Sequence, residues 1–106
     1  MLELSGLESV DVASMRDNAH EAARLLKLLA NENRLLVLCA LIEGECSVTE
    51  LNSRITLSQS ALSQHLALLR EEGLVTTRRE SQMIYYVLAE SKALPIIRTL
   101  HDLYCE

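Results

Sequence analysis

Apolar side chains recur with helical spacing along most of this 106-residue chain. A first stripe predicts an amphipathic helix from Ala13 to Leu29, and its members are Ala19, Ala22, Ala23, Leu26 and Leu29. The next segment, Arg34–Ile42, is apolar on nearly every side, and Asn31 before it suits the N-cap of a buried second helix. Residues 1–12 show weak periodicity, so we expect a loosely ordered arm there and one folded domain over residues 13–106.

Two short helices follow, and a brief turn joins them. Ser47 and Glu50 have the spacing of a capping box, which starts a third helix over Val48–Ile55. Ser58 suits the N-cap of a fourth helix, and Gly73 stops that helix. Two helices connected by so few residues form a helix-turn-helix, in which the second helix enters the major groove of DNA.

The last third of the chain predicts two strands and a helix. Between Leu74 and Leu88, β-branched and aromatic residues flank the polar segment Arg78–Gln82, a pattern typical of a hairpin. Ser91 then opens a final helix, Lys92–Tyr104, with an apolar stripe. A helix-turn-helix followed by such a hairpin is a winged helix. The predicted fold is therefore mainly α with a small β-hairpin wing: four helices, two strands and a fifth helix.

In the predicted fourth helix, apolar and polar residues separate onto two faces. Leu62, Leu66 and Leu69 recur at i, i+4 and i+7 and form the face to be buried. The other face carries amides and hydroxyls in place of the Glu and Lys of an ordinary solvated helix, and such side chains suit base edges and phosphate oxygens. Arginines at the hairpin tip are placed for phosphate or minor-groove contact. The candidate DNA-binding residues are Ser58, Gln59, Ser60, Ser63, Gln64, His65, Arg78 and Arg79.

Charge and composition refine this prediction. The net charge of −5 argues against a nucleic-acid binder, but residues 47–79 hold four arginines and three glutamates, a local balance of +1. With no Phe or Trp, an aliphatic core is thin for this length, which favours burial of apolar surface against a second copy. No stretch approaches the ~20 apolar residues of a membrane span, so we expect a cytoplasmic protein. No acid–base pair, Ser–His arrangement or phosphate-binding loop indicates an enzyme, and no cofactor is expected.

The run SVTELNSRITLSQSALSQHLALLREEGLVTTRRESQMIYYVL, residues 47–88, resembles the DNA-binding half of ArsR-type repressors, small dimeric winged-helix proteins of bacteria. The order of the flanking helices is similar as well. The resemblance implies a homodimer held by its first and last helices, with each recognition helix in one half of an inverted-repeat operator in double-stranded DNA.

Metal sensing, common in that family, does not fit the residues. The arsenic and cadmium sensors use a motif such as ELCVCDL, whose thiolate positions are occupied here by Ser47 and Thr49, with Cys46 in the place of leucine. The zinc sensors carry DxH and HxxE or HxxH on the last helix, which here offers only His101 and Asp102. No preformed metal site is visible.

Two other cysteines suggest a different signal. On its own, Cys39 in an apolar helix is most often an inert core residue. Together, however, Cys39 and Cys105 resemble the persulfide-responsive BigR, SqrR and HlyU branch, which implies that a low-molecular-weight persulfide links the two thiols, by a disulfide or a longer polysulfide, and releases DNA. Cys46 is expected to be a small apolar filler. The alternative is a metal-responsive repressor that uses Cys39, His101 and Cys105 as soft-metal ligands.

Overall fold

The computed structural model describes residues 5–105, with side chains from Val12 onward. The chain forms two compact units, Met1–Ala30 and Asn31–Glu106. The described part of the first unit is one helix, α1 (Ser5–Leu29), which begins eight residues before the predicted start at Ala13. The helix covers residues 5–12 of the predicted arm, and residues 1–4 lie outside the described part. The loose order of the arm stays a prediction.

The second unit contains four helices: α2 (Glu32–Ile42), α3 (Val48–Arg54), α4 (Gln59–Glu71) and α5 (Ala93–Tyr104). Three of them begin at the predicted caps. The Asn31 side chain accepts from the Arg34 backbone amide at 3.0 Å, and the Ser58 hydroxyl accepts from the Ala61 amide at 3.1 Å. Ser47 forms a complete capping box with Glu50. The helix starts therefore follow from local hydrogen bonds of the side chains.

The predicted hairpin is present, and a third strand joins it. The strands β1 (Cys46–Ser47), β2 (Val75–Glu80) and β3 (Met83–Leu88) form an antiparallel sheet in the order β1-β3-β2. Ser81 turns the hairpin with a positive φ of 59°. Strand β1 was not predicted because two residues carry no detectable alternation. It ties the entrance of α3 to the wing, since Ser47 pairs with Tyr85 and also caps α3.

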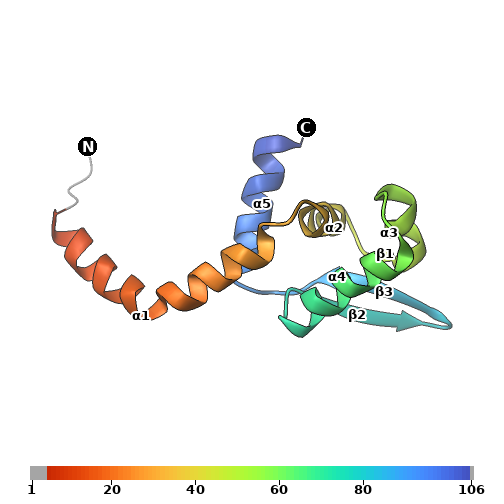
Figure 1. The fold of residues 1–106 in the computed structure, drawn as a ribbon, viewed down its shortest axis with the longest axis horizontal. Coiled ribbons are helices and arrows are strands. Elements are labelled where there is room, and N and C mark those ends of the chain that lie inside the picture. Colours follow the sequence, from red (N-terminus) through yellow and green to blue (C-terminus); the bar gives the residue numbers. More distant parts are fainter. Residues whose placement is uncertain (1–4, 106) are drawn as a thin grey trace. The chain divides into compact units, whose positions relative to one another are not determined.

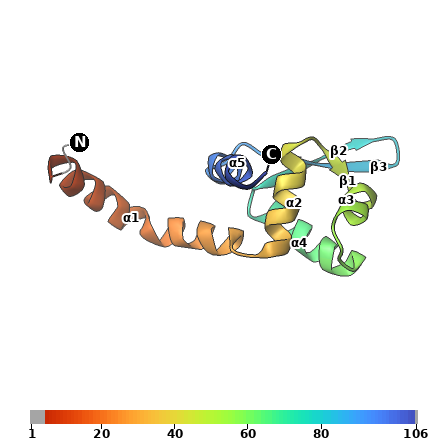
Figure 2. The same cartoon turned by 90° about the horizontal axis from the view of Figure 1, so that it is seen from above.

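Aliphatic side chains from several elements form the core of this unit. The fully buried ones are Val37, Leu38, Leu51, Leu62, Leu66, Leu69, Val75 and Ile97. They include the predicted buried face of α4 and Ile97 of α5, the helix that packs against α2 (Figures 1 and 2). Gly73, with φ at 81°, ends α4 as predicted. Helix α5 begins at Ala93, one residue after the predicted start, and its N-cap Lys92 makes no side-chain capping bond.

Some large apolar side chains are not buried in either unit. On α1 these are Val12, Met15 and Leu26, and on α5 they are Leu103 and Tyr104, the last being 82% exposed. The last turn of α5 therefore leaves part of its predicted apolar stripe uncovered. Among the described residues, no helix is both long enough and apolar enough to cross a membrane.

Candidate functional site

The polar face of α4 is open to solvent. Ser58, Gln59, Ser60, Ser63 and Gln64 are exposed, and His65 is half-buried. The Ser58 hydroxyl caps the helix and lies 3.4 Å from the Ser60 hydroxyl. Because the leucines of α4 are buried on the opposite side, this helix presents a row of amides and hydroxyls in the manner of a recognition helix.

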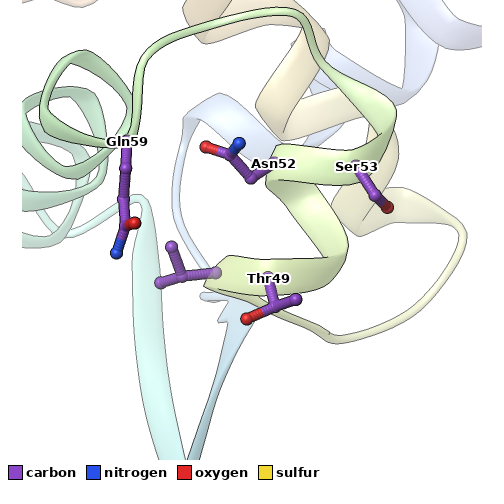
Figure 3. Close-up of a pocket in the computed structure, with 5 residues that line it drawn as sticks. Thr49, Asn52, Ser53 and Gln59 are labelled. Carbon is purple, nitrogen blue, oxygen red and sulfur yellow. The ribbon is translucent and has the colours of Figure 1, made fainter.

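A polar cavity of about 320 Å³ lies between α3 and the first turn of α4. Figure 3 shows Thr49, Asn52 and Ser53 on α3 and Gln59 on α4 around it. The Asn52 Oδ1 atom is buried and has no hydrogen-bond partner within the described residues. The sequence interpretation missed the three α3 residues, although the first helix of a helix-turn-helix normally crosses the DNA backbone. This general geometry of helix-turn-helix proteins could have pointed to α3 residues from the sequence alone.

The two wing arginines differ in their surroundings. Arg78 donates to both carboxylate oxygens of Glu45 and, at 2.8 Å, to Glu80, and its guanidinium lies 4.8 Å from the Tyr85 ring centroid. Glu45 and Glu80 raise the pKa of Arg78 further above its ordinary value. Arg79 is exposed, opposite Ile84 in the register, and has no ion-pair partner among the side chains of residues 12–105. Its charge is available to a ligand, whereas that of Arg78 is used inside the domain.

All three cysteines are free thiols, but their surroundings differ. Cys39 is half-buried on α2, Cys46 is buried in β1, and Cys105 is exposed just after α5. Burial raises the pKa of the Cys39 thiol, and the negative charges of the Cys105 thiolate and Glu43 raise it further. Helix α2, which carries Cys39, packs against α5, the helix that ends just before Cys105.

Cys46 lies in a separate environment. Burial raises its pKa, and the hydrogen bond from Arg54 opposes that shift. Its Sγ atom donates to the Gly44 carbonyl at 3.6 Å and accepts from Arg54 Nη1 at 3.7 Å. With 5% of its surface exposed, Cys46 packs as a small buried side chain. The part it takes in thiol chemistry stays a prediction.

Near Cys39, a shallow groove of about 170 Å³ opens to solvent. Its lining includes Cys39, Glu43 at the end of α2 and Arg54 at the end of α3. Arg54 Nη2 donates to Glu43 Oε1 at 2.7 Å, and this bond lowers the pKa of the Glu43 carboxyl. The other carboxylate oxygen lies 3.8 Å from His101 Nε2 on α5. Small reagents can therefore reach Cys39 beside an ion pair that joins two helices.

No metal centre accompanies the thiols in the part of the chain that the structure describes. There, no group of three or more His, Cys, Asp or Glu side chains is arranged to hold a metal ion. The alternative site of Cys39, His101 and Cys105 therefore has no geometric support.

Comparison with known proteins agrees with this architecture. Residues 31–77 match the family model described as "Bacterial regulatory protein, arsR family". The chain is also 50% identical, over 92% of its length and 90% of the relative's, to the transcriptional activator HlyU of Vibrio cholerae. It belongs to the ArsR family. A biofilm growth-associated repressor of Agrobacterium fabrum is 45% identical over 91% of this chain and 82% of its own.

Solved structures of ArsR-family relatives have the same fold. Reduced HlyU from Vibrio cholerae superposes with a TM-score of 0.80 at 53% identity, covering 88% of this chain and 98% of that one. The repressor BigR from Xylella fastidiosa gives a TM-score of 0.82 at 44% identity, covering 88% and 92%. The predicted winged helix and the resemblance to the BigR and HlyU branch are confirmed. The chain is a DNA-binding transcription regulator and not an enzyme.

Proposed function

We propose that this regulator is a homodimeric repressor that releases operator DNA when a persulfide links Cys39 to Cys105. The observation that carries the proposal is the placement of the two free thiols, Cys39 on α2 and Cys105 just after α5, on elements that pack against each other. The resemblance to the BigR and HlyU branch supports the same chemistry. One solved relative is described as reduced HlyU, which is in keeping with a thiol that has more than one redox state.

Dimerisation is supported by the uncovered apolar side chains. Met15 and Leu26 on α1 are 55% and 57% exposed, and Leu103 and Tyr104 on α5 are more exposed still. Burying such side chains against a second copy is favourable, at roughly 25 cal/mol per Å² of apolar surface. Two copies related by a two-fold axis present two α4 helices, which suits an inverted-repeat operator in double-stranded DNA.

The proposed DNA interface combines α4 with the wing. Gln59, Ser60, Ser63 and Gln64 lie in the first two turns of α4, where a helix in the major groove places its base-reading side chains. Ser58 and His65 contact phosphates at the edges. Of the two wing arginines, Arg79 has the free charge for phosphate contact. Thr49, Asn52 and Ser53 add neutral hydrogen-bonding groups beside the first turn of α4.

The chemistry needs two transfers. The exposed Cys105 thiolate attacks the outer sulfur of a persulfide RSSH, forming Cys105–SSH and releasing RS⁻. The Cys39 thiolate then attacks the inner sulfur of Cys105–SSH, forming the disulfide and releasing HS⁻. Both cysteine sulfurs are oxidised, and the transferred sulfur leaves reduced, so no further oxidant is required. A second RSSH inserts one more sulfur if it reacts with Cys105–SSH before Cys39 does.

The test combines intact-protein mass spectrometry with DNA-binding measurements on the protein's own promoter. A persulfide donor should remove two hydrogens from the mass, or add sulfur atoms for a longer bridge, and weaken DNA binding in parallel. Cys39→Ser and Cys105→Ser should bind DNA and fail to respond, whereas Cys46→Ser is the matched control and should still form the link when it is exposed to the persulfide donor. A Cys39→Ser protein that is released from DNA like the wild type would overturn the proposal.

A further inference from the structure

The Glu43 carboxylate lies where three helices meet. Glu43 is the C-cap residue of α2, one turn after Cys39. Its Oε1 atom accepts from Arg54, the last residue of α3, at 2.7 Å. Its Oε2 atom lies 3.8 Å from Nε2 of His101, which is on α5 one turn before Cys105. A single side chain therefore faces both cysteine-bearing helices and the first helix of the helix-turn-helix.

His101 completes the arrangement with an unused hydrogen-bonding atom. Its Nε2 atom is buried and has no hydrogen-bond partner in the described part of the chain. A buried polar atom without a partner is unfavourable, so a small movement that supplies one is favoured. The gap to Glu43 is 3.8 Å, and a hydrogen bond forms at ~3.2 Å or less, so a movement of about 0.6 Å is sufficient.

We propose that Glu43 and His101 are positioning residues that transmit the state of the thiol pair to α3. This inference rests on the proposed function. In the thiol form, Glu43 holds Arg54 and with it the end of α3. A disulfide brings the two sulfurs to ~2 Å from each other, closer than unbonded atoms can approach, and draws the last turn of α5 toward α2. His101 Nε2 then donates to Glu43 Oε2, and the movement of this carboxylate toward α5 lengthens the hydrogen bond from Arg54 Nη2 to Glu43 Oε1.

The consequence for DNA follows from what Arg54 contacts. Its Nη1 atom also reaches the Cys46 sulfur in β1 at 3.7 Å, so Arg54 connects the end of α3 with the sheet that carries the wing. Residues 55–58 alone separate α3 from the recognition helix. When the Arg54–Glu43 bond breaks, the recognition helix and the wing are no longer held through the same side chain.

The Arg54–Glu43 ion pair is weak enough to break without unfolding the domain. The Arg54 and Glu43 side chains are 44% and 55% exposed, and an ion pair so open to water contributes little to stability. Variants of the pair should therefore fold. In allosteric proteins an effector typically changes ligand affinity by about 5- to 150-fold. The loss of a bond of this kind can supply part of such a change.

The experiment first forms the disulfide and then measures whether its formation lowers the affinity for operator DNA. Each variant is linked with a thiol oxidant, peptide mass mapping verifies that the link joins Cys39 to Cys105 and leaves Cys46 reduced, and operator affinity is measured for both forms by fluorescence anisotropy. The wild-type pair should lose about tenfold or more in affinity on linking, within the usual range of coupling. His101→Ala should keep reduced-state affinity and lose most of this response, whereas His101→Gln, which retains a side-chain N–H donor, should restore it.

Glu43→Gln should bind weakly in the reduced state and change little on linking, while Glu90→Gln, an exposed residue outside this contact, should behave as wild type. A linked His101→Ala protein that leaves DNA as the wild type does would overturn the inference, and so would a normal response of Glu43→Gln. The proposed function fails separately, if a persulfide does not form the link in the wild-type protein. A linked wild-type protein that retains full affinity would overturn both.

Discussion

The unequal surroundings of Arg78 and Arg79 lead to a prediction about salt. The Arg78 guanidinium is shared between Glu45 and Glu80 and lies over the Tyr85 ring, so the cluster of these charges sums to −1. Arg79, on the other side of strand β2, is exposed. DNA binding releases counterions in proportion to the phosphates that a protein neutralises, with a slope of about −0.9 per phosphate in log affinity against log salt.

The magnitude follows from one Arg79 contact in each protomer of the proposed dimer. Arg79→Gln removes two phosphate contacts per dimer, so the slope should become shallower by about 1.8. Over a fourfold rise in salt, that difference corresponds to roughly a 12-fold change in relative affinity. Arg78→Gln removes no phosphate contact and should leave the slope unchanged, although it should weaken binding by loosening the wing.

The assay is titration of operator DNA by fluorescence anisotropy at several salt concentrations between 50 and 200 mM, roughly the range over which such slopes are resolved. Arg98→Gln, an exposed arginine on α5, serves as a control for loss of one positive charge far from the wing. Arg78→Lys is a second control, because lysine keeps the positive charge but lacks the planar guanidinium that bonds two carboxylates. Equal shallowing by Arg78→Gln and Arg79→Gln would refute the assignment, as would an unchanged slope for Arg79→Gln.

Three further predictions concern the core, a cap and a thiol. Leu66→Ala should lower the free energy of unfolding by about 2–5 kcal/mol in urea titrations, because the side chain is fully buried, while Ala67→Ser on the exposed side should change it by ~0.5 kcal/mol or less. Ser47→Ala should cost ~1 kcal/mol by the same measurement, since it removes the α3 cap. Because burial raises the pKa of Cys39 above its ordinary value, its alkylation rate, followed by peptide mass spectrometry, should level off at a higher pH than that of a cysteine in a short unfolded peptide; a plateau at the same or a lower pH would contradict the assignment.

Local chemistry was the part of the fold that the sequence could predict. The caps at Asn31, Ser47 and Ser58 bond to amides three residues away, so a short window contains the whole interaction. The leucine face of α4 was equally visible, because helical periodicity repeats within the segment. The predicted start of α1 was eight residues late, because residues 5–12 show weak helical periodicity.

Contacts between distant segments could not be predicted from local pattern. Arg78 bonds to Glu45 across 33 positions, and no pattern within the hairpin indicates that partner. The pairing of β1 with β3 and the approach of Glu43 to both Arg54 and His101 likewise depend on tertiary packing. Cys39 and Cys105 were singled out only by resemblance to relatives, because no periodicity relates residues so far apart.

The double role of Ser47 restricts how this domain can be redesigned. Its backbone belongs to β1 while its hydroxyl begins α3, so a residue inserted there would shift the strand register and the helix cap together. The hairpin turn at Ser81 is exposed and joins strands whose register is already fixed on both sides. An insertion at the wing tip should therefore leave the α3 cap and the strand register intact, and a spectroscopic probe placed there would report on DNA contact by the wing.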